Sequence, residues 1–265
     1  MNSHGAASAG MQWTHYRSLV AGLVARNIKV KYQRSVLGFL WTLLNPLIMA
    51  LVLITVFTHI IRIQIDHFWA FLISGYFAWN YINTSLFAAS YTLAEHAHIT
   101  RSIAFPSELL IVSAALSRLV EFTVELLLVI AILAIWLHGK IPASYLLCPV
   151  LLLMMFLLTV GLQLPIAALA VFYKDVEHAL PVALTALFYL SPVFYPVSLI
   201  PEPMQPYYML NPIAQLMSLF HIVLYEGQFP PLELFLSTCI KVGVILAVSY
   251  FLLFNRFKKV FAEIV

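Results

Sequence analysis

The stretch 173–201, YKDVEHALPVALTALFYLSPVFYPVSLIP, decides how the rest of the chain is interpreted. It begins with a charged cluster between two apolar segments: Lys174, Asp175 and Glu177. A hydrophobic segment follows, and two Xaa-Pro pairs at 191–192 and 195–196 interrupt its far end. Proline inside a membrane helix is tolerated where protein or a water-filled cavity satisfies the freed backbone groups. The stretch therefore predicts a charged turn that a soluble partner can contact on one side of a membrane and a gate on the other.

The composition is that of an integral membrane protein. Hydrophobic residues make up 63% of the 265 residues, charged residues only 9%, and the mean hydropathy is +0.96. Soluble domains contain about 25% charged residues. Strands of alternating polarity are absent, which favours an all-α protein over an outer-membrane barrel. The first ten residues are not followed by an apolar core, so we expect no cleavable signal peptide.

Six apolar stretches have the length of about 20 residues that a helix needs to cross a bilayer. These predicted spans are 36–60, 68–93, 109–137, 144–173, 179–199 and 232–254. Together they predict one transmembrane domain over 36–254. We expect a disordered N-terminus over 1–14 and a C-terminal tail over 255–265.

Residues 15–34 predict an amphipathic helix before the first span. Its apolar side chains recur at helical spacing, and most of its basic residues lie off that stripe. A helix of this kind lies in the membrane interface with its basic groups facing anionic head groups.

The basic residues predict the orientation. Ten lie at the termini or in loops on one side: Arg17, Arg26, Lys29, Lys31, Arg34, Arg101, Lys174, Arg256, Lys258 and Lys259. The opposite side has only Arg62 and Lys140. The positive-inside rule then predicts that both termini are cytoplasmic. The connection 200–231 is external, has no Lys or Arg and is rich in proline, so we expect one or two short re-entrant or interfacial helices there.

Four charged residues lie within or near the spans: Arg118, Glu121, Glu125 and Lys241. The first three share a helix face because they are three and four positions apart. Charges in hydrocarbon cost several kcal/mol unless they are paired or hydrated. One interpretation makes them part of a polar translocation path. The other makes them structural pairs, Arg118 with Glu121 and Lys241 with Glu125 across helices.

Aromatic residues are abundant, and several suit an interfacial belt. The group Phe188, Tyr189, Phe194 and Tyr195 is denser than a belt requires. Aromatic rings with hydroxyl groups combine apolar stacking with hydrogen bonding, which suits the faces of sugars. Packing remains the alternative for each ring taken singly.

The sequence contains no motif for catalysis, and no P-loop is present, so we expect no cofactor on this chain and no ATP binding by that route. The histidines are scattered, and His96 and His98 have no further ligands nearby, so we expect no metal site. Cys148 and Cys239 lie in apolar runs and imply no disulfide.

Three segments resemble ABC-2-type permeases that export lipid-linked polysaccharides, such as O-antigen exporter permeases and the related teichoic-acid exporters. They are RNIKVKYQRSVLGFLWTLLNP at 26–46, VFYKDVEHALPVALTALFYLSPVFYP at 171–196 and MLNP at 209–212. With the six-span layout, the resemblance covers nearly the whole chain. Asn27 and Lys174 depart from it, because the family commonly has an acidic residue and an arginine there.

The resemblance implies a role for each of these regions. The 15–34 helix and two loops would contact a separate ATPase subunit, through Arg26, Lys29, Glu95, Arg101, Lys174, Asp175 and Glu177. Spans one and five from two copies of the chain would line a conduit, with Trp41, Asn45, Phe188, Tyr189, Phe194 and Tyr195. The 201–227 region would form an external gate with Tyr207, Tyr208 and Asn211.

The resemblance thus implies a permease subunit in the inner membrane of a bacterium, working as a homodimer with an ATPase that binds ATP and Mg²⁺. Its substrate is expected to be a lipid-linked polysaccharide, and no nucleic acid is expected as a partner. Two alternatives stay open: an ABC-2 permease for a drug or small lipid, and a membrane enzyme that transfers sugars onto polyprenyl carriers.

Overall fold

The computed structural model describes residues 3–95 and 107–254, and throughout these ranges the regular structure is helical. Seven helices form the body of the molecule: α1 (Ser3–Tyr32), α2 (Trp41–Thr55), α3 (Phe68–Glu95), α5 (Ser107–Trp136), α6 (Cys148–Phe172), α7 (Asp175–Tyr189) and α10 (Leu232–Val248). Two shorter helices, α8 (Gln205–Tyr208) and α9 (Pro212–Phe220), lie between α7 and α10. Short helical turns extend or precede these elements: η1 (Gly38–Leu40), η2 (Val56–Ile60), η3 (Ala143–Leu147), η4 (Val197–Leu199), η5 (Glu202–Met204), η6 (His221–Tyr225) and η7 (Ser249–Phe254).

Four helical segments within the described ranges are long and apolar enough to cross a membrane. They are Gly38–Ile60, Ser107–Trp136, Ala143–Phe172 and Leu232–Phe251, close to four of the stretches expected from sequence. The pair Glu202–Tyr208 and Pro212–Tyr225, bent by 104°, would make a fifth if it is one broken span. α3 is 28 residues long but carries polar side chains such as Asn80 and Asn83, and α7 has only 15 residues. The all-α class is confirmed, whereas the number of six spans stays a prediction.

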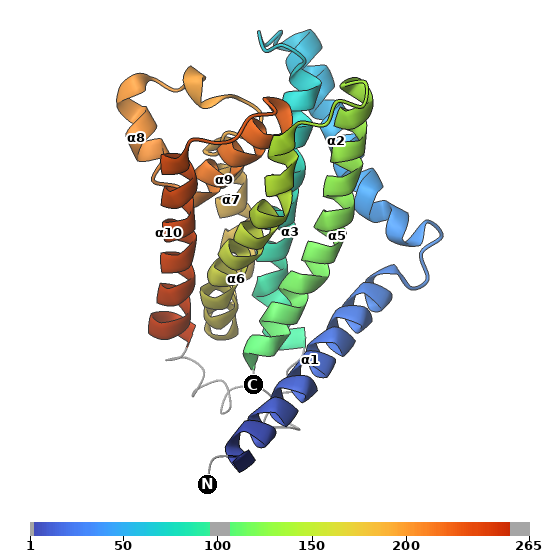
Figure 1. Ribbon diagram of the computed structural model, residues 1–265, viewed down its shortest axis with the longest axis vertical. Coiled ribbons are helices and arrows are strands. Elements are labelled where there is room, and N and C mark those ends of the chain that lie inside the picture. Colours follow the sequence, from blue (N-terminus) through green and yellow to red (C-terminus); the bar gives the residue numbers. More distant parts are fainter. Residues whose placement is uncertain (1–2, 96–106, 255–265) are drawn as a thin grey trace.

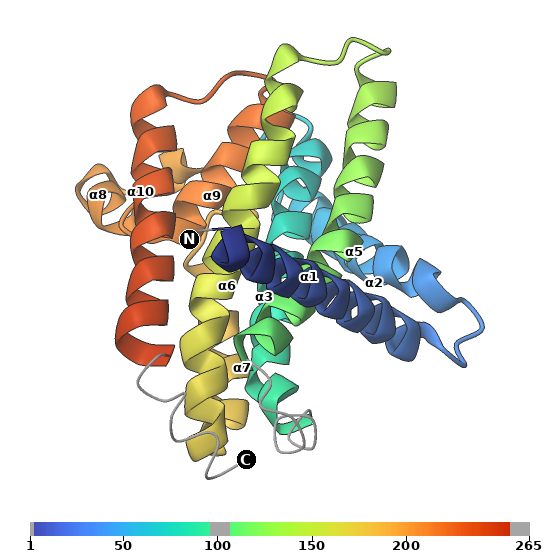
Figure 2. The same ribbon diagram turned by 60° about the horizontal axis from the view of Figure 1, so that its bottom comes forward.

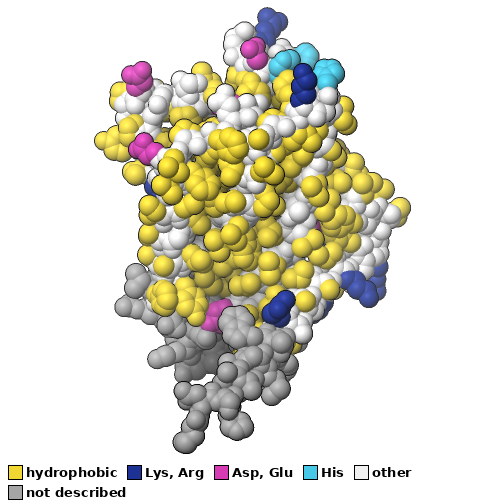
Figure 3. All heavy atoms as spheres, in the orientation of Figure 1, with side chains coloured by type: hydrophobic (Ala, Val, Ile, Leu, Met, Phe, Trp, Pro, Cys, Tyr) yellow, Lys and Arg dark blue, Asp and Glu magenta, His cyan; other side chains and the backbone are white. Residues whose placement is uncertain are grey.

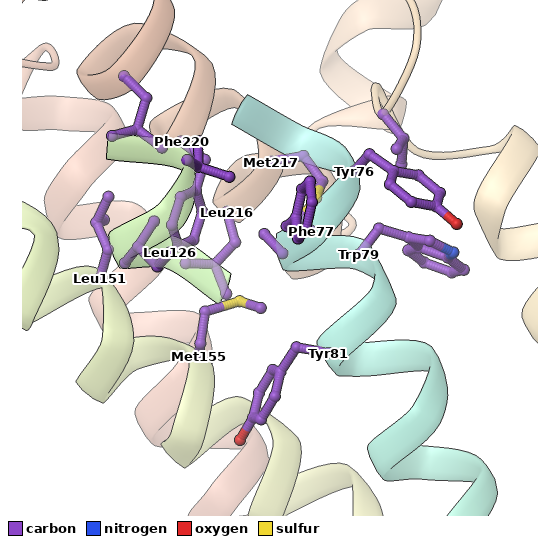
Figure 4. Close-up of a cluster of buried hydrophobic side chains, with 14 of the residues drawn as sticks. Tyr76, Phe77, Trp79, Tyr81, Leu126, Leu151, Met155, Leu216, Met217 and Phe220 are labelled. Carbon is purple, nitrogen blue, oxygen red and sulfur yellow. The ribbon is translucent and has the colours of Figure 1, made fainter. Parts of the chain in front are cut away.

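α3 is the central helix of the bundle. It packs against α2, α5, α6, α7 and α9, and between Phe68 and Ile82 nearly every side chain is buried. Figure 4 shows the result: Phe77 and Tyr81 of α3 belong to one buried cluster with Leu126 of α5, Met155 of α6 and Phe220 of α9, and Tyr81 lies toward Met155. A helix buried on all sides gains apolar contact all round, so α3 can carry polar residues that a lipid-facing helix could not.

The segment between α7 and α10 folds back into the bundle. Every residue of α9 from Ile213 to Phe220 is buried, and α9 contacts α3, α6 and α10. Asn211 begins this helix, because its side-chain oxygen accepts a hydrogen bond from the Ile213 backbone N–H at 3.0 Å. Short helices were expected here from sequence. Their burial in the core is what the structure adds.

α1 crosses one end of the bundle and packs against α5 (Figure 2). It runs from Ser3 to Tyr32, so it begins twelve residues before His15, where we expected a disordered segment to end. That preceding segment is rich in alanine, the residue with the highest helix propensity. The start of α1 lies at the same end of the molecule as the end of α3, the start of α5 and the end of α10 (Figure 1).

The surface between the two ends is largely apolar. Figure 3 shows hydrophobic side chains over the middle of one face, with most charged side chains toward its upper and lower ends. Leu127, Val182 and Ile240 are each at least 60% exposed, although they lie on three different helices. This distribution is typical of a protein whose middle faces lipid or another membrane subunit.

Candidate functional site

A cluster of polar side chains joins three helices near the end of α1. Lys31 donates hydrogen bonds to both carboxylate oxygens of Glu121 on α5, each at 2.8 Å, and Arg118 donates to the same carboxylate at 2.9 Å. The Tyr32 hydroxyl contacts Glu121 at 2.8 Å and also bonds to the Thr42 hydroxyl on α2. We call these five residues the α1–α5 node. Through it, α1 is tied to both α2 and α5.

The physical reason for the node is the burial of Glu121. This residue is only 5% exposed, and a carboxylate removed from water requires compensating partners. Arg118 supplies one from its own helix at i,i+3 spacing, which confirms the Arg118–Glu121 pair expected from sequence. Lys31 supplies the other. Burial, and after it the neighbouring Arg118 guanidinium, lowers the pKa of Lys31, while the Glu121 carboxylate opposes that shift.

The pairing of Lys241 with Glu125 is wrong. Lys241 instead donates to the backbone carbonyl of Met209 at 2.6 Å. Met209 is the residue that ends the short helix α8, where carbonyl groups lack partners within the helix. Glu125 is 5% exposed, and its Oε2 atom has no hydrogen-bond partner within residues 3–95 and 107–254.

Two cavities border the node and share Lys31, Arg118 and Glu121 in their walls. The smaller, of about 220 Å³, lies among α1, α2, α3 and α5 and contains both carboxylates, Glu121 and Glu125. The larger, of about 530 Å³, lies among α1, α3 and α5. Its walls are Arg26, Asn27, Ile28, Val30, Lys31, Ala88, Tyr91, Thr92, Ala114, Ser117, Arg118 and Glu121.

The residues expected to contact a soluble subunit fall on separate elements. Lys174, Asp175 and Glu177 are exposed at the turn between α6 and α7, and the two acidic residues occupy the first turn of α7. Acidic side chains there also stabilise the helix through its dipole. Lys29 is exposed on α1, whereas Arg26 lines the larger cavity. Glu95 is the last residue of α3, and Arg101 lies outside the described residues.

Four aromatic residues from the end of α7 form one cluster: Phe188, Tyr189, Phe194 and Tyr195. Their ring centroids lie 5.0–5.8 Å apart along the chain of contacts. Phe57 in η2 and Trp79 of α3 extend the cluster: the Phe57 ring lies 5.0 Å from that of Phe194, and the Trp79 ring 5.7 Å from that of Phe188. The sequence-predicted rings are therefore brought together.

The other two residues expected along a conduit lie elsewhere. Trp41 and Asn45 are exposed in the first turns of α2 and border the smaller cavity. Of the expected gate residues, Tyr207 is 76% exposed, and Asn211 is the cap of α9. The Tyr195 hydroxyl donates to the carbonyl of Tyr189 at 2.7 Å and lies 2.6 Å from the Tyr208 hydroxyl, which links α8 to the aromatic cluster.

Residues 18–225, most of the chain, match the sequence profile of the ABC-2 type transporter family. The chain belongs to the ABC-2 type transporter family. The resemblance seen in the sequence is thereby confirmed, and the chain is a permease subunit by family.

Two similar proteins are permeases of O-antigen export systems. This chain is 30% identical over 251 residues to the O-antigen export system permease protein RfbA of Myxococcus xanthus, a match that covers 94% of this chain and 95% of the relative. It is 26% identical over 248 residues to the Klebsiella pneumoniae protein of the same name, and this match covers 93% of this chain and 94% of the relative. The likeness therefore extends along nearly the whole length of all three proteins.

Sequence reasoning missed how α1 of the permease is held. Lys31 entered only as one of the ten basic residues that set the orientation, yet it binds Glu121, 90 residues away. Asn27, noted as a departure from the family, donates to Ser117 of α5 at 3.3 Å. An acidic residue inside an apolar run and a basic residue near the end of another helix were signals of an ion pair that the sequence contains. The sequence does not say that the two helices are neighbours.

Sequence reasoning also missed His221 of the permease, which lies in the buried turn after α9. Its ring stacks on Phe71 at 3.9 Å between centroids. Its Nε2 atom lies 2.8 Å from the carbonyl oxygen of Pro192, and its Nδ1 atom lies 2.8 Å from the hydroxyl of Ser74. His221 thus connects α3, the proline-containing segment after α7 and the turn after α9.

Proposed function

We propose that this permease is the membrane subunit of an ATP-driven exporter that moves a lipid-linked polysaccharide of the O-antigen type across a bacterial inner membrane. The observation that carries the proposal is the similarity to O-antigen export permeases along 94% of the chain. The exposed apolar middle of the molecule and the aromatic cluster support it.

The proposal includes six spans with both termini in the cytoplasm. α3 supplies a span because its 28 residues measure about 42 Å at the usual rise of 1.5 Å per residue, longer than the bilayer core. α7 and the non-helical segment after it supply another. The excess of basic residues at one end of the bundle supports the cytoplasmic assignment of that end.

A separate ATPase subunit binds ATP and Mg²⁺ and acts on the cytoplasmic end of the permease. Among the described residues, the exposed turn at Lys174–Glu177 and α1 are the elements available to it. Closure of two ATPase subunits would move these elements as rigid bodies. The α1–α5 node then gives α1 a direct connection to α5 through Lys31 and to α2 through the Tyr32–Thr42 hydrogen bond.

Two copies of the permease build the conduit. α2 and α7 each present an exposed face: Ile48 and Val52 are 53% and 49% exposed, and Val182 and Tyr189 are 71% and 61% exposed. A two-fold axis along these faces lets each copy supply half of the wall. Many weak aromatic contacts let a polymer slide, whereas one tight site would hold it.

Deletion of the gene tests the function. We expect cells without the permease to lose surface polysaccharide and to accumulate lipid-linked polysaccharide on the cytoplasmic side, because synthesis continues without export. Normal surface polysaccharide in the deletion strain would rule the function out.

Asp175 and Glu177 test the coupling to the ATPase. We expect D175A/E177A to lower the stimulation of the ATPase by the permease about fivefold, because two charged contacts worth about 0.5–1 kcal/mol each are lost. The rate is measured in proteoliposomes that contain both subunits. E226A, which removes an exposed acid before Gly227, is the matched control and should leave the rate unchanged. An unchanged rate for the double variant would argue against coupling at this turn.

Cysteine cross-linking tests the dimer. In a background without Cys148 and Cys239, we expect V182C on α7 to form cross-linked dimers in membranes. L127C on α5, which is 60% exposed, should stay monomeric under the same oxidant because its helix faces lipid. Equal cross-linking at both positions, or cross-linking at L127C alone, would contradict the proposed two-fold axis.

A further inference from the structure

The described side chains that line the larger cavity include more cations than carboxylates. Arg26, Lys31 and Arg118 line it, and among the side chains that the structure describes the only carboxylate in its wall is that of Glu121. Lys31 and Arg118 both bond to that carboxylate, whereas Arg26 makes no ion pair with the side chains described in 16–93 and 107–251. The described side chains of the cavity therefore carry an excess of two positive charges, which favours an anionic ligand.

The rest of the cavity offers two further kinds of surface. Asn27 and Tyr91 bring an amide and a hydroxyl group that can donate to phosphate oxygens. The Ser117 hydroxyl already donates to the Ser113 carbonyl at 2.7 Å and accepts from Asn27, so it positions that amide. Ile28, Val30, Ala88 and Ala114 bring apolar surface, and Val30 is 52% exposed. A free inorganic anion would use only the polar part, whereas a lipid with a phosphate head group would use both.

The position of the cavity agrees with the level of lipid head groups. Ala88 and Thr92 lie in the last two turns of α3, which ends at Glu95. Ala114 and Ser117 lie seven and ten residues after Ser107, the first residue of α5, a distance of about 10–15 Å along the helix. Basic pockets between transmembrane helices at the cytoplasmic side are places where anionic lipid head groups bind.

We propose that this cavity binds the phosphate-bearing head group of a lipid, with Arg26 as the main cation that contacts the phosphate and the lipid tail directed toward the bilayer. The chemistry is shared by a polyprenyl pyrophosphate carrier and by an anionic phospholipid. The carrier is the expected source, and that part rests on the proposed export of a lipid-linked polysaccharide. A head group held here would lie against the α1–α5 node, so its arrival would be sensed where α1 meets α5.

The experiment measures lipid binding to the full-length chain in phosphatidylcholine nanodiscs, with polyprenyl pyrophosphate as the probe. We expect R26Q to weaken binding about tenfold, because charge-assisted hydrogen bonds to phosphate are lost. A114L, which narrows the cavity without changing its charge, should weaken binding as well. R17Q removes one positive charge from an exposed position of the same helix and should bind as the wild type does.

Two further probes identify the source of the head group. Preference for polyprenyl pyrophosphate over phosphatidylglycerol assigns the cavity to the carrier, and equal competition assigns it to phospholipid. Tighter binding of an acidic peptide than of either lipid would overturn the proposal, as would unchanged binding by R26Q and A114L or an equal loss in R17Q. These results do not depend on the deletion strain, so a failed lipid site and a failed export function are told apart.

Discussion

Replacing Glu121 with alanine is expected to lower the free energy of unfolding by about 2–3 kcal/mol, because Lys31 and Arg118 would remain side by side without their shared carboxylate. Breaking a fully buried ion pair costs about 3–5 kcal/mol, and the partial exposure of Lys31, 38% for its side chain, reduces that figure. The loss of the Tyr32 contact adds to the effect. Chemical denaturation of the purified permease in detergent measures the change.

A double-mutant cycle separates the ion pair from other effects of the substitution. We expect K31M and E121Q to destabilise the permease singly and to show a coupling energy of about 1–2 kcal/mol when combined. E233Q, at an exposed position in the first turn of α10, is the matched control and should change stability by less than about 0.5 kcal/mol. Additive effects of K31M and E121Q would show that the node does not hold α1 to α5.

Introducing a side chain at Gly75 is expected to have an effect of similar size. A Cβ atom there would lie 2.6 Å from Cε1 and 2.7 Å from Nε2 of His221, closer than such contacts allow. The His221 ring cannot move away, because it is stacked on Phe71 and bonded to Ser74 and Pro192. We expect G75A to lower the free energy of unfolding by about 2–3 kcal/mol, as overpacking does in tight cores.

G243A is the control for this substitution. Gly243 lies in α10 with nothing within 4 Å of the added Cβ atom, so alanine should be neutral or stabilising by up to about 1 kcal/mol. If the clash with His221 is the cause, the second substitution H221A should recover part of the stability lost in G75A. No recovery would show that the added side chain is excluded for another reason, such as the carbonyl oxygen of Val193, which would lie 3.3 Å from the new Cβ atom.

The aromatic cluster shows how far sequence could go toward the candidate site. Phe188, Tyr189, Phe194 and Tyr195 are near one another in the chain, so their gathering followed from local sequence. Trp41 and Asn45, grouped with them through the family resemblance, lie at the other end of α2 and border the smaller cavity. That all six residues line one conduit remains a prediction. The structure brings together only the four rings and their neighbours.

The hydropathy of the chain was enough to place four long helices and to establish an all-helical membrane protein, because apolar runs of bilayer length have few other stable states. The motifs at 26–46 and 171–196 were enough to indicate the family. Only the tertiary structure decided the partners of the buried polar groups: Lys31 for Glu121, the Met209 carbonyl for Lys241, and Ser74 with the Pro192 carbonyl for His221. The physical reason is that burial obliges a polar group to find a partner, but which one it finds depends on which helices pack together, and hydropathy carries no information about neighbours.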